Sequence, residues 1–103
     1  MPNDRALKWI SKEAEAKIAD FTNQELAMVA WSYAKIGIFE DFSLRIVTQE
    51  TRARLDRLTT QDLSVLIWAF ARSGAKSREV MEILAWEVLK RSKQLIPQDL
   101  GNI

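Results

Sequence analysis

The sequence predicts an all-α protein, an α-solenoid of stacked helix-turn-helix repeats with a period of 37 residues. The main observation is a repeated segment. Residues 22–37 recur as residues 59–74 with the pattern T-x-Q-[ED]-L-[AS]-x-[VL]-x-W-[AS]-[YF]-A-[KR]-x-G, and a third copy begins at residue 96 and is cut at 103. Three glutamines at equal spacing give the period, Gln24, Gln61 and Gln98. A period of this length is typical of small helical units that stack without a single closed core.

Each repeated segment is expected to form a first helix, here called helix A, with a marked start. Thr22 stands three residues before Glu25, and Thr59 stands three residues before Asp62. This spacing is that of a capping box, in which the threonine hydroxyl and the acidic side chain satisfy each other's backbone amides. In the third copy Pro97 takes the first helical position, which its fixed φ favours.

A second helix, helix B, is expected after each glycine that ends helix A. Gly37 and Gly74 are placed where a left-handed residue closes a helix at low cost. Helix B is then expected at 40–55 and at 77–92, and an N-terminal helix at 4–19 fits the same template. The whole chain, 1–103, is therefore expected to be one solenoid segment. It divides into helix B of a preceding repeat (1–20), two repeats (21–57 and 58–94) and a truncated repeat (95–103).

Neither end carries the polar capping repeat that a solenoid normally needs. We therefore expect a fragment of a longer array, or a piece that rests on partners.

The composition argues against several classes of function. The chain has no histidine and no cysteine, so the usual general base, nucleophile and zinc ligands are missing, and it has no glycine-rich phosphate loop. We expect no enzymatic activity, no cofactor, no metal site and no small-molecule substrate. Charged residues interrupt every apolar segment, which argues against a membrane span. The net charge of +1 argues against a nucleic-acid binder that relies on charge alone.

A wide apolar arc on helix A is expected to pack between helix B and the neighbouring repeats. The aromatic residues of this arc are assigned mainly to the core, although the tryptophans could also stack on bases: Trp31, Tyr33, Trp68 and Phe70. Trp86 occupies the helix B position that Gln49 has in the first repeat. It is expected to be buried, with an anchoring role toward a protein partner as the alternative.

The opposite arc of helix A carries a polar row that recurs along the expected stack. It combines an amide in the first turn, a residue that varies between copies and a basic residue in the last turn. A constant backbone contact beside a variable residue suits a repeat protein that follows single-stranded RNA base by base. Alternatively, the amides cap the helix and the basic residues complement its dipole. The candidate RNA-binding residues are Gln24, Met28, Ser32, Lys35, Gln61, Val65, Arg72, Gln98 and Asn102.

Basic residues also gather near the end of each helix B. They either complement the helix dipole or contact an RNA backbone. These residues are Arg45, Arg52, Arg54 and Arg57 in the first repeat, and Lys90, Arg91 and Lys93 in the second.

The repeated pattern resembles organellar helical-repeat families, namely the heptatricopeptide and octotricopeptide repeats and, further off, the FAST-kinase-like repeats. It is carried by Gln24, Leu26, Trp31, Ala34, Lys35 and Gly37, and by Gln61, Leu63, Trp68, Ala71, Arg72 and Gly74. The resemblance implies an α-solenoid that acts on RNA in a mitochondrion, or alternatively a plastid. Its role would lie in RNA processing, stability or translation, or in an organellar ribosome. The alternative is a protein-protein scaffold subunit of a large organellar assembly.

Overall fold

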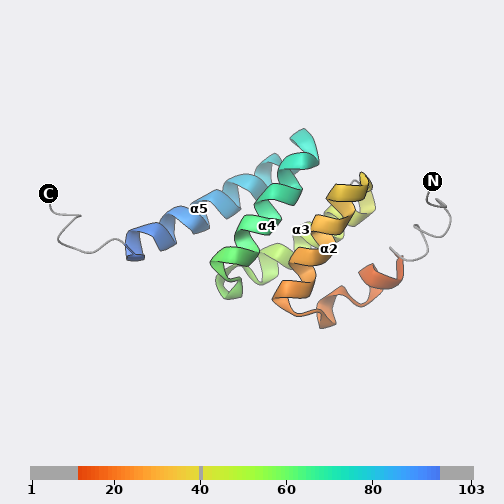
Figure 1. The fold of residues 1–103 in the computed structure, drawn as a ribbon, viewed down its shortest axis with the longest axis horizontal. Helices are drawn as coiled ribbons and strands as arrows, with labels where there is room; N and C mark the ends of the chain where they lie inside the picture. Colours follow the sequence, from red (N-terminus) through yellow and green to blue (C-terminus); the bar gives the residue numbers. More distant parts are fainter. Residues whose placement is uncertain (1–11, 40, 96–103) are drawn as a thin grey trace, which may run out of the picture.

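The computed structural model describes residues 12–39 and 41–95, and within these ranges the chain forms helices and short turns with no β-strand (Figure 1). The all-α prediction is confirmed for this part. Residues 12–16 are helical. They are followed by η1 (Ile18–Asp20), α2 (Asn23–Ile36), α3 (Asp41–Ala53), η2 (Leu55–Arg57), α4 (Thr60–Arg72), η3 (Gly74–Ser77) and α5 (Arg78–Leu95). The start of the predicted helix 4–19 and the third copy of the repeat lie outside the described residues.

Both predicted capping boxes are present. The Thr22 hydroxyl accepts a hydrogen bond from the Glu25 amide at 3.1 Å, and the Glu25 carboxylate accepts one from the Thr22 amide at 2.7 Å. Thr59 and Asp62 exchange the same two bonds at 3.0 and 3.2 Å. These bonds satisfy amides that have no partner within the helix, and they set where α2 and α4 begin.

The two predicted helix-ending glycines have left-handed backbones, with φ of +92° at Gly37 and +84° at Gly74. At the end of α2 the amides of Gly37 and Ile38 both donate to the carbonyl of Tyr33. At Gly74 the chain begins the short turn η3, and the buried Ser77 hydroxyl at the end of this turn donates to the carbonyl of Phe70 on α4 at 2.6 Å. Both devices allow the chain to turn from α2 into α3 and from α4 into α5.

The helices form two layers. In Figure 1, α2 and α4 lie side by side in front, and α3 and α5 lie behind them. The core lies between the layers, where the Phe39 ring stands 6.2 Å from the Tyr33 ring and 5.3 Å from the Phe70 ring, measured between centroids. Tyr33 and Phe70 are therefore core residues, as expected. The front layer leaves one side of α2 and α4 open to solvent.

Candidate nucleic-acid interface

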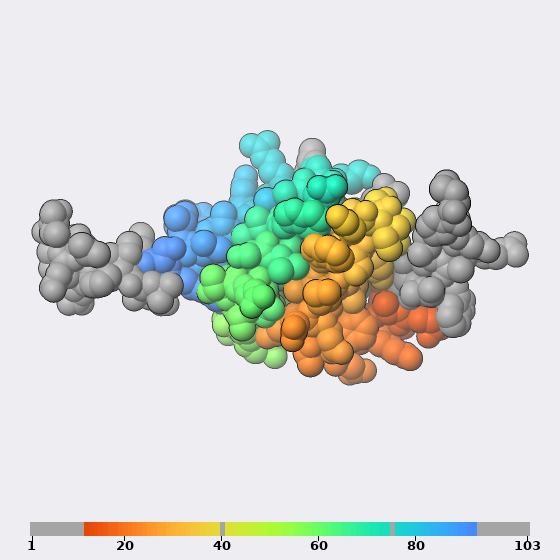
Figure 2. Space-filling model, viewed as in Figure 1, coloured from red at the N-terminus to blue at the C-terminus, as the bar shows by residue number. Residues whose placement is uncertain are grey.

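The open side of the front layer is formed by α2 and α4, whose atoms adjoin in the middle of the view in Figure 2. Each helix contributes four residues at spacings of four, three and four positions, which places them on one face of a helix. The row on α2 is Gln24, Met28, Trp31 and Lys35, and the row on α4 is Gln61, Val65, Trp68 and Arg72. We call these two rows the α2–α4 face.

The first half of this face surrounds a hollow of about 490 Å³. Two of the predicted pairs line it, the amides Gln24 and Gln61 and the variable residues Met28 and Val65. Both glutamines are exposed, and Val65 is half-buried. The hollow is also lined by Thr22, Asn23, Ala27, Thr59 and Asp62. Amide groups and apolar side chains are thus brought together at the start of two neighbouring helices.

The second half of the face holds two stacked tryptophans. The Trp31 and Trp68 rings lie 6.1 Å apart between centroids at an interplanar angle of 25°, and each residue keeps 37% of its surface exposed. The expectation that these residues pack mainly in the core is therefore wrong. Trp31 follows Gln24 by seven residues, which is within about 20° of two full helical turns, so it shares the exposed face of that glutamine.

A cation lies over each tryptophan. The Lys35 ammonium is 5.9 Å from the centroid of the Trp31 ring, and the Arg72 guanidinium is 4.7 Å from that of Trp68. Both distances lie in the range of cation–π attraction. The sequence carries a signal for this arrangement, because a tryptophan and a basic residue four positions apart are neighbours on a helix surface.

The remaining candidates take less part in this face. Ser32 is half-buried at its edge, and its counterpart on α4, Ala69, is fully buried. Gln98 and Asn102 lie outside the described residues. The described face therefore brings together six side chains of the candidate set and adds Trp31 and Trp68 to them.

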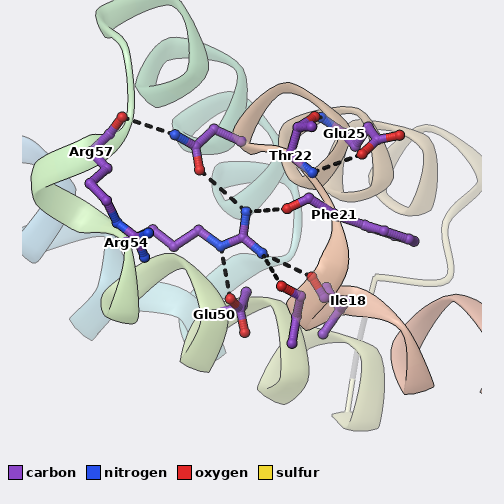
Figure 3. Close-up of polar contacts among 9 residues, drawn as sticks. Ile18, Phe21, Thr22, Glu25, Glu50, Arg54 and Arg57 are labelled. Atoms are coloured by element: carbon purple, nitrogen blue, oxygen red, sulfur yellow. Dashed lines mark hydrogen bonds and ion pairs between the residues drawn. The ribbon is translucent and has the colours of Figure 1, made fainter.

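Arg54, one of the basic residues at the end of helix B, does not face solvent. It is 5% exposed, and its guanidinium donates to the carbonyls of Ile18 and Ala19 at 2.9 and 3.3 Å and to that of Phe21 (Figure 3). It also pairs with Glu50 at 2.7 Å. Contact between this residue and an RNA backbone is excluded by its burial. Arg54 instead ties the end of α3 to η1 and to the start of α2.

Arg91 occupies the corresponding position on α5. It pairs with Glu87 at 2.9 Å and donates to the carbonyl of Leu55 at 3.2 Å. The hydrogen bond from Arg91 lowers the pKa of the Glu87 carboxyl, although burial of that group acts in the opposite direction. The recurrent glutamate and arginine four residues apart are a sequence signal for the two ion pairs, but not for the contacts with distant carbonyls.

The other basic residues of these clusters differ in their surroundings. Arg45, Arg52, Arg57 and Lys90 are exposed, and Arg52 pairs with Glu79 at 3.5 Å. The side chain of Lys93 lies outside the described part. Trp86 is 71% exposed, so the expectation of its burial is wrong.

The α2–α4 face offers ring surfaces, amides and two cations. Within residues 12–39 and 41–95 no three histidine, cysteine or acidic residues cluster as metal ligands would, and no helix there is long and apolar enough to cross a membrane. The chain matches no family model, and neither a curated protein nor a solved structure shows significant similarity to it.

Proposed function

We propose that this chain is an α-solenoid with a 37-residue repeat that binds single-stranded RNA through the α2–α4 face and catalyses no reaction. The observation that carries the proposal is the exposed Trp31–Trp68 stack with Lys35 and Arg72 over its rings. In agreement with the resemblance to organellar repeat families, the RNA would be a transcript or ribosomal RNA of a mitochondrion, or alternatively of a plastid.

Equivalent contacts support the repeat organisation. Arg54 reaches the carbonyl of Ile18, and Arg91 reaches that of Leu55, so each donor and each acceptor has its counterpart 37 residues further along. Alanines 27, 30 and 34 are buried on α2, whereas the matching residues 64 and 71 on α4 are exposed and residue 67 is half-buried. A surface that is covered on one helix and open on the next is typical of elements that stack by translation.

The face suits RNA in three ways. Stacking of a base on an aromatic side chain contributes about 1–3 kcal/mol per base in single-stranded complexes. We expect Lys35 and Arg72, which are exposed beside the tryptophan rings, to meet phosphates of the bound RNA. Gln24 and Gln61 offer donors and acceptors to base edges at the hollow, where Met28 and Val65 provide the variable contact.

The salt dependence of RNA binding follows from the number of cations on the α2–α4 face. Two cations on the face correspond to two phosphate contacts, so the logarithm of the affinity should fall with the logarithm of salt concentration with a slope of about −1.4. This slope is shallow for a nucleic-acid binder, because stacking contributes to affinity without releasing counterions.

The test is fluorescence anisotropy of labelled single-stranded RNA at several salt concentrations. Replacing Lys35 and Arg72 together by alanine should lower the affinity and flatten the salt slope. Replacing Trp31 and Trp68 together by leucine should lower the affinity by about tenfold or more and leave the slope unchanged. Arg45→Ala removes an exposed arginine from α3 in the other layer and should have no effect if the RNA lies on the α2–α4 face. A loss of affinity in this variant would instead assign the RNA backbone to the basic residues of helix B.

If neither double variant changes RNA binding, the proposal fails. The α2–α4 face would then be assigned to another subunit, and the chain to a protein-protein scaffold in a large organellar assembly.

A further inference from the structure

The outer surface of α5 exposes large apolar side chains away from the α2–α4 face. Trp86 is 71% and Leu89 is 55% exposed. With Ile83 and Leu55 they line a hollow of about 350 Å³. Exposed apolar groups of this size at adjacent helical positions are typical of a contact site for another macromolecule. We call Ile83, Trp86 and Leu89, with the flanking Glu82 and Lys90, the α5 surface.

A following repeat would leave Trp86 exposed. Trp86 and Leu89 stand at the repeat positions of Gln49 and Arg52 on α3. Gln49 and Arg52 remain exposed although α5 follows α3 in the fold. By the same geometry, a helix that followed α5 would leave Trp86 open to solvent.

The charges of the α5 surface are arranged symmetrically about Trp86. Glu82 lies four residues before it and Lys90 four residues after it. When two identical helices pair antiparallel about a two-fold axis at Trp86, Glu82 of one copy lies level with Lys90 of the other. On α3 the residues four positions from Gln49 are Arg45 and Ala53, so that helix lacks the complementarity.

The apolar residues follow the same symmetry. Ile83 lies three residues before Trp86, and Leu89 lies three residues after it. In the antiparallel pair, Ile83 of one copy therefore lies level with Leu89 of the other. The present partners of the charged groups, Arg78 for Glu82 at 3.6 Å and Glu87 for Lys90 at 3.3 Å, are ion pairs in which at least one side chain is largely exposed. Such pairs contribute little to stability and can exchange partners.

We propose that the α5 surface binds a second copy of this chain, with the two α5 helices antiparallel about a two-fold axis at Trp86. The hollow beside Leu55 accommodates apolar side chains of the second copy. Because α5 belongs to the second layer and passes behind α4 (Figure 1), the pairing leaves the α2–α4 face open. The dimer is independent of the proposed RNA binding, and each can fail without the other.

Sedimentation equilibrium of the 103-residue chain tests the proposal. The wild-type mass should rise from 11.9 kDa toward twice that value with increasing concentration. Trp86→Gln, which introduces the residue found at position 49, should weaken the dimer by about tenfold or more. Phe42→Gln removes an aromatic side chain of similar exposure, 53%, from α3 and should leave the dimer unchanged. Far-UV circular dichroism confirms that both variants keep their helices.

Charge reversal tests the two-fold arrangement. Glu82→Lys alone places like charges opposite each other at both ends of the interface, and so does Lys90→Glu alone. Each should weaken the dimer by about two- to tenfold, as expected for exposed pairs. An equimolar mixture of the two single variants should form a heterodimer of wild-type strength, because every lysine again meets a glutamate.

Three outcomes would overturn the inference. They are a wild-type chain that stays monomeric at its highest soluble concentration, a dimer that Trp86→Gln leaves intact, and a mixture of the charge variants that associates no better than either alone.

Discussion

Among the charged side chains that the structure describes, Arg54 is expected to contribute most to the stability of the fold, because its guanidinium is buried and fully hydrogen-bonded. The group is buried and bonds to carbonyls of Ile18, Ala19 and Phe21, to the side-chain oxygen of Asn23 and to Glu50. Its backbone acceptors lie 33 to 36 residues earlier in the chain. Arg54→Ala would leave these acceptors without their donor.

The magnitude follows from these contacts. Removing one partner of a buried, hydrogen-bonded ion pair costs about 3–5 kcal/mol. This is a large part of the total free energy of unfolding of a small domain, which is on the order of 5–15 kcal/mol. Arg91→Ala is the matched control. Arg91 donates to one distant carbonyl, and Lys90 remains beside Glu87 at 3.3 Å when Arg91 is removed. Arg91→Ala should therefore lower the free energy of unfolding by only about 1–2 kcal/mol.

Urea unfolding, monitored by tryptophan fluorescence, measures the free energy of unfolding of both variants. The values can be compared when the free energy falls with urea concentration at the same slope in each variant. Arg54→Lys should fall between wild type and Arg54→Ala, because a single ammonium group keeps the charge but cannot reach all the acceptors. A cost below about 1 kcal/mol for Arg54→Ala, or one equal to that of Arg91→Ala, would refute the assignment of Arg54 as the tie between η1, α2 and α3.

Two further predictions concern single buried side chains. The hydroxyl of Thr51 is buried without a hydrogen-bond partner in the described part, and Val88 occupies the matching position on α5. Thr51→Val should therefore raise the free energy of unfolding, measured in urea, by roughly 1 kcal/mol. A destabilised variant would contradict this. Because Arg91 lowers the folded pKa of Glu87, that carboxylate stabilises the fold above its unfolded pKa, and the contribution is lost as the pH falls through the folded pKa. The stability advantage of wild type over Glu87→Gln should therefore shrink between neutral and acidic pH, and a constant difference would contradict the pKa shift.

Features that depend on close neighbours in the chain could be predicted from the sequence. The capping boxes join residues three positions apart, and Gly37 and Gly74 are needed because a left-handed backbone costs other residues more. Helical spacing also placed six candidate residues on one face. Their role in RNA binding remains a prediction.

The surroundings of the large side chains could not be predicted in the same way. The wide apolar arc of helix A placed Trp31 and Trp68 in the core, but both rings lie on the open side of α2 and α4, where they stack on each other. Trp86 was also expected to be buried, but it is 71% exposed. Hydrophobicity alone does not show which face of a helix has a neighbour.

The sequence by itself determined where α2 and α4 begin and end, roughly where α3 and α5 lie, and the period of 37 residues on which the proposed repeats rest, because these depend on short spacings and on self-similarity. Only the tertiary structure decided that Arg54 is a buried link and that Trp31 and Trp68 stack on each other. In both cases the tertiary structure brings together residues more than thirty positions apart, as with Arg54 and Ile18 and with Trp31 and Trp68. Such contacts depend on how neighbouring helices pack, which a local pattern does not contain.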